Sequence, residues 1–414
     1  RGRTSPLLGN RFPNCPERGG SMSEQRETYK LTSGRLSDES PYVKQQIAMQ
    51  LKELAGSGQV LVGYREYSVM QGVPPEVLKT VEVLMGAGMD VIQAGACSLP
   101  ELSLQSRVFR APAVYTDDET TFYLDASGSY LQGEFPVVRV ERWKRGGLKS
   151  IKPIREYVRF LRRELAAEAL STVSIAIGGL FNAELLSLLS QALPLKGLWR
   201  ERSERELDVQ SVGDSVQRMQ ATLGIKLDST GCLAEFVDEK GTKLQTAVAG
   251  ALIARYLKEI GGLRSASKAW GISRFFDRVL DRCGLKIEEN ADLAVGEEII
   301  YKPHLGVGDG LWLGLLLGEI TAVMGRPLSE IIAEMEEVVG RTETRLLLLE
   351  KGELEDYLRK ISGKKYSLEE RGELQLAGTT IAWRKQGANL YQVLLDGEPS
   401  KLRSLSEVLP PGIS

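Results

Sequence analysis

Residues 223–241 of this 414-residue chain read LGIKLDSTGCLAEFVDEKG. An apolar run ends at Asp228, a loop of small or mixed residues follows, and a second apolar stretch reaches Val237. The next residues, DEKG, are typical of a hairpin turn. The stretch therefore predicts a strand, a loop, a second strand and a tight turn.

The chain has nearly balanced charge, which limits the classes of partner. Its 53 Lys and Arg residues are scattered along the sequence and are balanced by 55 Asp and Glu residues, which argues against a nucleic-acid partner. The most apolar segment, residues 311–324, contains Glu319 and is shorter than the roughly 20 residues that span a bilayer. We therefore expect a buried helix there and no membrane partner.

Cysteine spacing and the N-terminal residues bear on the cellular setting. The four cysteines lie far apart without a C-x-x-C pair, which predicts neither a disulfide framework nor a zinc site and favours a reducing cytoplasm. Residues 1–27 carry Arg, Gly, Ser and Pro without apolar periodicity or a signal-peptide core. They predict a disordered tail, with Met22 as a candidate natural start.

Strand-like and helix-like patterns alternate along most of the chain. Helices are expected at residues 41–54, 74–85, 154–169, 183–193, 245–260 and 267–283, from Leu311, and from about Arg326 to about Glu350. Strands are expected at residues 59–63, 90–93, 172–177 and 285–287, as a hairpin at 113–116 and 121–124, and within 374–395. This order predicts an α/β protein of three consecutive units with mixed sheets, plus a smaller C-terminal α+β domain. The predicted boundaries are a tail at 1–27 and domains at 28–150, 151–242, 243–340 and 341–414.

Short motifs from about Tyr29 onward follow the order of a known family. Residues 60–64, VLVGY, are similar to V-x-V-G-x-D-x-R, and residues 95–102, GACSLPEL, are similar to G-x-x-P-T-P-x-L. Residues 32–35, TSGR, are a shortened F-G-T-[SD]-G-I-R-G, and residues 308–310 read G-D-G. The series resembles the α-D-phosphohexomutases, the relatives of phosphoglucomutase and phosphomannomutase. That resemblance implies Mg²⁺-dependent phosphoryl transfer between two hydroxyls of a hexose.

The opening stretch resembles the metal loop of that family, D-G-D-x-D-R followed by V-D-E-x-G, in which three carboxylates hold Mg²⁺. The three carboxylate positions here read Asp228, Thr230 and Cys232, and Leu233 stands at the Arg position. One carboxylate with a hydroxyl and a thiol is a poor ligand set for a hard divalent cation. We interpret Asp228 as a strand-ending turn residue and keep it only as a weak metal candidate.

The nucleophile motif of the family, A-S-H-N-P, has no counterpart. Residues 114–116 run directly through Asp117, Asp118 and Glu119 into the predicted hairpin. Thr116 is a weak substitute nucleophile, but three neighbouring acids would repel an incoming phosphate. We therefore predict a turn with a solvated acidic tip and no catalytic residue.

Two further motifs concern the substrate. Gly296, Glu297 and Glu298 match the start of the sugar-binding G-E-E-S-G-H, although Ser, Gly and His do not follow. Val295 and Gly296 equally match the upstream V-G-x-K, and both alignments stay open. Residues 384–390, RKQGANL, match the phosphate-binding R-x-S-[GN]-T-E-P with loss of its hydroxyls and acid. The substrate-binding candidates are accordingly Glu297, Glu298, Arg384 and Lys385, the last two with solvated cations beside a turn as the alternative.

Two residues of the third unit are expected to be structural. His304 is the only histidine and lies in a turn bounded by proline, where a structural role is far commoner than a catalytic one. Asp309, within G-D-G, is expected to cap the helix from Leu311.

Loss at the nucleophile, metal, sugar and phosphate motifs together predicts a phosphohexomutase-like protein of carbohydrate metabolism without mutase chemistry. As such a pseudoenzyme it would need no cofactor and would bind a hexose or hexosamine phosphate, or regulate an active mutase or another enzyme of sugar metabolism. One alternative is an active, diverged mutase that uses Mg²⁺, with Asp117, Asp118, Glu119, Asp228 and Arg384 as replacement groups. The other is a ligand-free scaffold.

Overall fold

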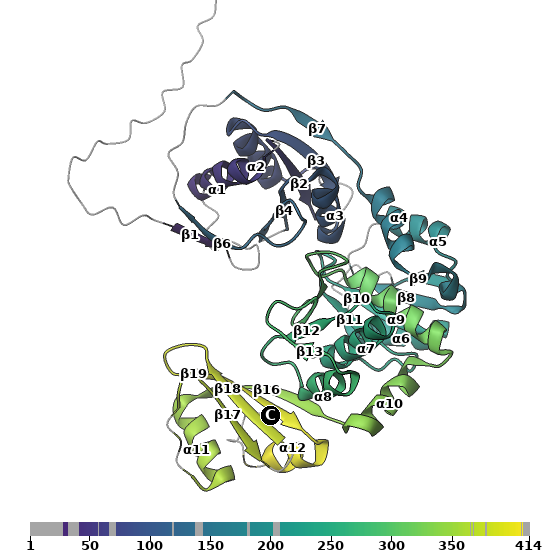
Figure 1. Ribbon diagram of the computed structural model, residues 1–414, viewed down its shortest axis with the longest axis vertical. Coiled ribbons are helices and arrows are strands. Elements are labelled where there is room, and N and C mark those ends of the chain that lie inside the picture. The colour runs from purple at the N-terminus through teal and green to yellow at the C-terminus, as the bar shows by residue number, and fades with distance from the viewer. Residues whose placement is uncertain are drawn as a thin grey trace, which may run out of the picture.

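The computed structural model describes residues 28–31, 41–56, 58–65, 72–117, 120–136, 144–179, 183–201, 208–364, 366, 368–376, 379–406 and 408. The predicted tail at 1–27, the motif at 32–35 and the acids Asp118 and Glu119 lie outside the described residues. Four larger sheets follow one another along a curved path, with the first and the fourth at its two ends (Figure 1). We refer to residues 28–150, 151–242, 243–340 and 341–414, which contain these sheets, as the first to fourth domains.

The first sheet has the order β5-β4-β2-β3-β7 and is parallel except for the β4–β5 hairpin. Its strands are β2 (Gln59–Tyr64), β3 (Asp90–Ala96), β4 (Ala113–Thr116), β5 (Thr121–Leu124) and β7 (Leu148–Ser150). One face packs on α1 (Pro41–Leu54) and α2 (Pro75–Gly86), and the other packs on α3 (Leu99–Phe109). Apart from this sheet, β1 (Thr28–Leu31) pairs with β6 (Gly133–Pro136). The hairpin agrees with the prediction residue for residue.

The second sheet contains the opening stretch and has the order β11-β10-β8-β9. Its strands are β8 (Ser174–Gly178), β9 (Gly197–Arg200), β10 (Leu223–Leu227) and β11 (Ala234–Val237). Its helices are α4 (Ile154–Glu164), a 3-10 helix (Ala167–Thr172), α5 (Ala183–Ala192) and α6 (Val209–Met219). Strands β10 and β11 are antiparallel, and Gly241 N–H donates to Asp238 C=O in the following turn at 3.0 Å, so the predicted strand, loop, strand and turn are confirmed.

The third sheet has the order β13-β12-β14-β15. Its strands are β12 (Ser265–Lys268), β13 (Lys286–Ile287), β14 (Leu293–Val295) and β15 (Ile299–Tyr301), and the adjacent helices are α7 (Thr246–Glu259), α8 (Arg274–Cys283), α9 (Gly310–Met324) and α10 (Leu328–Val339). The predicted helix at 267–283 is wrong at its start, because β12 ends at Lys268 and Ser273 caps α8.

Helix α9 crosses from the third range to the second sheet. A Cβ added to Gly314 would lie 2.1 Å from Ile225 Cδ1, so the glycine lets the helix approach β10 closely. Every residue from Gly310 to Thr321 is buried, which confirms the predicted buried helix. Among the described residues no single helix has the length and apolarity to cross a membrane; α9 and α10 pass that test only as a pair bent by 82°.

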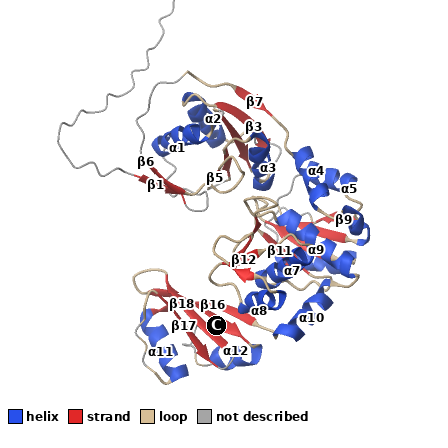
Figure 2. Ribbon diagram, in the orientation of Figure 1, coloured by secondary structure: helices blue, strands red, loops and turns tan. Residues whose placement is uncertain are grey.

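The fourth sheet is antiparallel, with the order β16-β19-β18-β17. Its strands are β16 (Glu343–Glu350), β17 (Arg371–Leu376), β18 (Thr379–Lys385) and β19 (Leu390–Gly397), and its helices are α11 (Lys351–Ser362) and α12 (Pro399–Ser406) (Figure 2). The predicted helix up to Glu350 is wrong, because α10 ends at Val339 and residues 343–350 pair with β19.

Candidate functional site

The loop between β10 and β11 satisfies its own polar groups. The Thr230 hydroxyl donates to Asp228 Oδ2 at 2.7 Å, and Leu233 N–H donates to Asp228 Oδ1 at 3.0 Å. Cys232 N–H in turn donates to Thr230 Oγ1 at 3.1 Å. Asp228 therefore holds the turn together with both of its carboxylate oxygens.

These residues do not fit a magnesium ion. Thr230 and Cys232 are 6% and 2% exposed, and burial, then the charges of Glu298 and Asp228, raises the pKa of the Cys232 thiol. A hard divalent cation prefers ionised oxygens, and a neutral buried thiol offers none. Within the described ranges, no three His, Cys, Asp or Glu side chains come together as a metal site. The geometry is consistent with the turn interpretation of Asp228.

Two helix N-termini fix the loop from outside. Leu99 N–H, at the start of α3, donates to Thr230 C=O at 2.9 Å. Gly310 N–H, at the start of α9, donates to Gly231 C=O at 2.9 Å. The first helical N–H groups lack partners inside their own helix, so the loop carbonyls satisfy them. The loop is thus a junction between the first domain and α9.

Thr116 lies at the end of β4 but is buried. Thr116 is 5% exposed, and its hydroxyl oxygen has no hydrogen-bond partner in the described part of the chain. Next to it, Asp117 Oδ1 lies 3.3 Å from Arg65 Nη1, and Asp117 Oδ2 accepts from the Ser229 hydroxyl at 3.0 Å. The prediction of a solvated tip is wrong for Asp117, whose side chain is only 17% exposed because it joins the first domain to the loop.

Glu297 and Glu298 occupy the turn between β14 and β15, and only Glu297 is exposed. Glu298 Oε1 and Oε2 lie 2.9 and 3.0 Å from the Tyr130 hydroxyl, which donates to this carboxylate, and Gly308 N–H donates to Oε2 at 3.1 Å. The same hydroxyl lies 3.7 Å from Cys232 Sγ. Burial, followed by the charges of Cys232 and Glu298, raises the pKa of Tyr130. Glu298 therefore anchors the turn to Tyr130 of the first domain, and Tyr130 in turn contacts the loop.

Arg384 and Lys385 lie at the end of β18. The Arg384 guanidinium carbon sits 4.4 Å from the ring centre of Trp270, in the third domain, and Arg384 Nε donates to Gln392 Oε1 at 2.9 Å. Lys385 is exposed. The pair therefore lies on the fourth sheet, and Arg384 faces the third domain.

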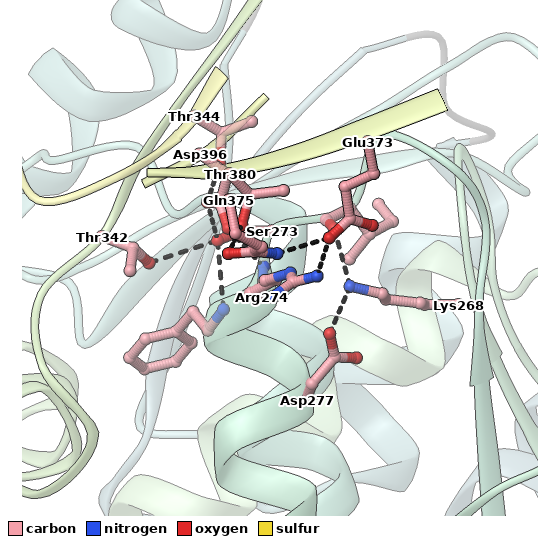
Figure 3. Close-up of polar contacts among 12 residues, drawn as sticks. Lys268, Ser273, Arg274, Asp277, Thr342, Thr344, Glu373, Gln375, Thr380 and Asp396 are labelled. Atoms are coloured by element: carbon pink, nitrogen blue, oxygen red, sulfur yellow. Dashed lines mark hydrogen bonds and ion pairs between the residues drawn. The ribbon is translucent and has the colours of Figure 1, made fainter. Parts of the chain in front are cut away.

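Sequence reasoning missed the polar contact between the third and fourth domains (Figure 3). Asp396, on β19, accepts from the Ser273 hydroxyl at 2.5 Å, from Arg274 N–H at 2.8 Å and from the Thr344 hydroxyl at 3.0 Å. Arg274 also pairs with Glu373. Asp396 thus caps α8 from another domain, which no local pattern could reveal because it lies 123 positions from Ser273.

His304 and Asp309 have structural surroundings. His304 is 2% exposed and stacks on Trp312 and Phe160, with ring centres 4.1 and 4.8 Å away. Its Nε2 lies 2.9 Å from Asp309 Oδ2, and the Tyr157 hydroxyl donates to Asp309 Oδ1 at 2.8 Å. Trp312 N–H also donates to Asp309 Oδ1, at 3.0 Å, which confirms the predicted helix cap.

Comparison with known proteins gives partial sequence matches and nearly complete structural ones. No family model matches the chain. The phosphoglucosamine mutase of Moorella thermoacetica is 32% identical over 134 residues, which are 28% of this chain and 30% of that protein. The phosphoglucosamine mutase of Geobacillus thermodenitrificans is 30% identical over 140 residues, which are 29% of this chain and 31% of that protein. The matched segment thus spans less than a third of either relative.

Three solved structures extend over most of the chain. A putative phosphomannomutase from Thermus thermophilus matches with a TM-score of 0.70 at 15% identity, over 92% of this chain and 98% of that one. A phosphoglucomutase/phosphomannomutase family protein from Burkholderia thailandensis matches with a TM-score of 0.67 at 15% identity, over 92% of this chain and 98% of that one. Parafusin, a phosphoglucomutase from Paramecium in its open form, matches with a TM-score of 0.68 at 12% identity, over 95% of this chain and 96% of that one. At such identities these matches establish the fold, to which the two mutases add a shared segment of sequence. The chain therefore has the fold of these solved phosphomannomutase and phosphoglucomutase structures and shares one segment of sequence with two phosphoglucosamine mutases.

Proposed function

We propose that this phosphohexomutase-like protein of carbohydrate metabolism has lost mutase chemistry and binds a sugar phosphate in a regulatory role in the cytoplasm. The observation that carries the proposal is the loop after β10, where both Asp228 oxygens are used by Thr230 and Leu233. A loop closed on itself in this way has no ligand set to offer a divalent cation.

The position of Thr116 supports the same proposal. A nucleophile must reach the phosphorus atom, and this hydroxyl belongs to a residue that is 5% exposed. The neighbouring Asp117 carboxylate opposes the approach of a phosphate. Phosphoryl transfer depends on positioning and charge stabilisation acting together, so weakness at both the metal and the nucleophile positions is worse than loss of either one.

Binding groups remain at the candidate substrate positions. Arg384 and Lys385 carry positive charge at the end of β18, and a guanidinium can hold two phosphate oxygens at once. Glu297 is exposed at its turn and can accept hydrogen bonds from sugar hydroxyls. The matched relatives are phosphoglucosamine mutases, which supports a hexosamine phosphate, or otherwise a hexose phosphate, as the ligand.

Thermal unfolding with a panel of hexose and hexosamine phosphates tests the proposal, each compound being measured with and without Mg²⁺. Binding to the native state raises the apparent melting temperature by mass action. We expect a shift with at least one compound, equal with and without Mg²⁺, and no turnover of any compound. Mg²⁺-dependent turnover would establish the active mutase instead.

Matched arginine variants locate the binding. Arg384→Gln should abolish the shift, whereas Arg359→Gln should keep it, because Arg359 lies on α11 of the same domain and pairs with Asp356 there. Absence of a shift with every compound in the unmodified protein would favour the ligand-free scaffold. Affinity purification of the unmodified chain would then be the way to find a protein partner such as an active mutase.

A further inference from the structure

Strand β16 is an edge of the fourth sheet, next to β19 and at the opposite side from β17. In the described part of the chain, its pairing partner is β19 alone. An edge strand presents unpaired N–H and C=O groups that can accept another strand. Proteins usually protect such edges with a central charge, a proline, a bulge or a covering segment. The centre of β16 reads LLLL, without charge or proline.

The open face of this edge is apolar. Leu346 and Leu348 are 53% and 57% exposed, and no other strand among the described residues carries two exposed large apolar side chains. Leu390, on the neighbouring β19, is 40% exposed and lies opposite Glu350, so it belongs to the same face. The buried Leu349 points to the other face, toward the helices. The apolar face is therefore continuous across two strands and reaches the sheet edge.

We propose that β16 pairs with β16 of a second copy of this chain, antiparallel, about a two-fold axis at Leu347. A two-fold axis normal to the sheet keeps each side chain on its own face, so one residue must pair with its own copy, and the axis lies midway between the two. With Leu347 at the axis, Leu346 of each copy faces Leu348 of the other, and the four exposed leucines cover one another. Glu343 of each copy then lies opposite Lys351 of the other, at the start of α11.

Neighbouring registers pair fewer leucines with leucine and separate Glu343 from Lys351. An axis at Leu346 places Leu348 opposite Thr344, and an axis at Leu348 places Leu346 opposite Glu350. Each of them covers fewer leucines with leucine, and each loses the pairing of Glu343 with Lys351. Register in a sheet follows the match of side chains on the buried face, so the axis at Leu347 is favoured.

Sedimentation of the full-length protein over a range of concentrations tests the association. The unmodified chain should form dimers, and Leu348→Lys should raise the dissociation constant at least ~10-fold, because it places charges inside the apolar contact. Leu78→Lys is the matched control, since Leu78 is 51% exposed on α2, and it should leave the dimer unchanged. A monomer at every concentration, or a dimer that Leu348→Lys does not weaken, would overturn the proposal.

Cysteine cross-linking tests the register separately. In Leu347→Cys the two introduced residues would be directly opposite, with Cα atoms about 4.5–5.5 Å apart, within the range that a disulfide bridges. Mild oxidation should therefore give a covalent dimer. Leu346→Cys alone should not cross-link, but its mixture with Leu348→Cys should, because these two positions face each other. The unmodified chain, which keeps its four native cysteines, serves as the oxidation control. A failure of Leu347→Cys to cross-link would reject this register.

Discussion

The third domain contacts its two neighbours in opposite ways. Toward the second sheet it sends α9, whose residues Gly310 to Thr321 are all buried and whose Gly314 lies against Ile225. Toward the fourth domain it presents the N-terminus of α8, and the contact there is made by Ser273, Arg274 and Asp396. The first junction is a shared apolar core, and the second is a set of directed polar contacts.

Each junction contains a buried carboxylate, and the two carboxylates differ in their surroundings and partners. Glu319 on α9 accepts from Ala166 N–H at 2.6 Å and from the Tyr256 hydroxyl at 2.5 Å, with apolar packing all around. In the other junction Asp396 accepts hydrogen bonds from Ser273 and Arg274 at the start of α8 and from Thr344 within its own domain. Helix α9 thus joins its two sheets through apolar packing, whereas polar and charged side chains make the described contacts between α8 and the fourth domain.

The largest effect should come from adding a methyl group at the apolar junction. In Gly314→Ala the new Cβ would lie 2.1 Å from Ile225 Cδ1, so the helix or the strand must move. Overpacking of this kind should lower the free energy of unfolding by about 3 kcal/mol. Gly352→Ala on α11 is the matched control: it has nothing within 4 Å and should be neutral or slightly stabilising. Denaturant unfolding measures both variants.

A double-mutant cycle assigns the Gly314 effect to its cause. Ile225→Ala removes the atoms that the new methyl group meets, so the double variant should be more stable than the sum of the two single effects predicts. Strict additivity would show that α9 and β10 are not in contact at this point.

The polar junction should respond to loss of one carboxylate. Asp396→Ala leaves the Ser273 hydroxyl and Arg274 N–H without their acceptor, which should cost about 2.5 kcal/mol. Since the fourth domain has an apolar core of its own, we expect it to unfold as a separate transition. Hydrogen exchange at the Arg274 amide should become faster, while amides of α9 keep their protection. A single transition in which α9 loses protection equally would contradict the division into two kinds of junction.

Local patterns in the sequence were enough to place much of the fold. The β4–β5 hairpin follows from its aromatic and β-branched residues on either side of an acidic turn, and the Asp309 cap follows from an acid before an apolar helix. The self-contained loop at Asp228 is also local, since its partners Thr230 and Leu233 lie within five positions. Side chains and backbone groups close in sequence leave a pattern that can be read.

The failures have tertiary causes. Charged residues flanking β16 favoured a helix, but pairing with β19 and burial of Leu349 outweigh that local preference. Asp117 was expected in solvent because Arg65 and Ser229, its partners, lie 52 and 112 positions away. Burial of Thr116 and the Tyr130–Glu298 contact likewise require the assembled domains. The candidate site could therefore be located by motif, but its chemistry depends on contacts that only the fold supplies.

Alkaline pH offers a weaker perturbation of the fourth domain. Burial raises the pKa of Tyr357, on α11, to about 12, whereas an unfolded tyrosine titrates near 10. The folded state thus favours the protonated phenol, so this stabilisation is complete below about pH 10 and is lost as the pH rises toward 12. The contribution of Tyr357, about 2 kcal/mol, should be lost over that window in the unmodified protein, so the fall in stability should be smaller by about that amount in Tyr357→Phe. The two pH profiles of unfolding free energy should run parallel below about pH 10, where a packing difference gives only a constant offset; a divergence there would show that another titrating group contributes.

The smallest expected effect concerns Arg384 and Trp270, which add to the polar junction at a distance from Asp396. Their separation of 4.4 Å suits a cation–π contact, and a partly exposed pair of this kind contributes about 0.5–1 kcal/mol. A cycle of Trp270→Leu, Arg384→Gln and the double variant should return a coupling of that size in the unfolding of the fourth domain. High salt should reduce this coupling energy less than it reduces the energy of the Arg274–Glu373 ion pair, because that ion pair is more exposed to solvent. A coupling of zero would leave Asp396 as the main link, and the effect of Asp396→Ala on domain separation should then be close to complete.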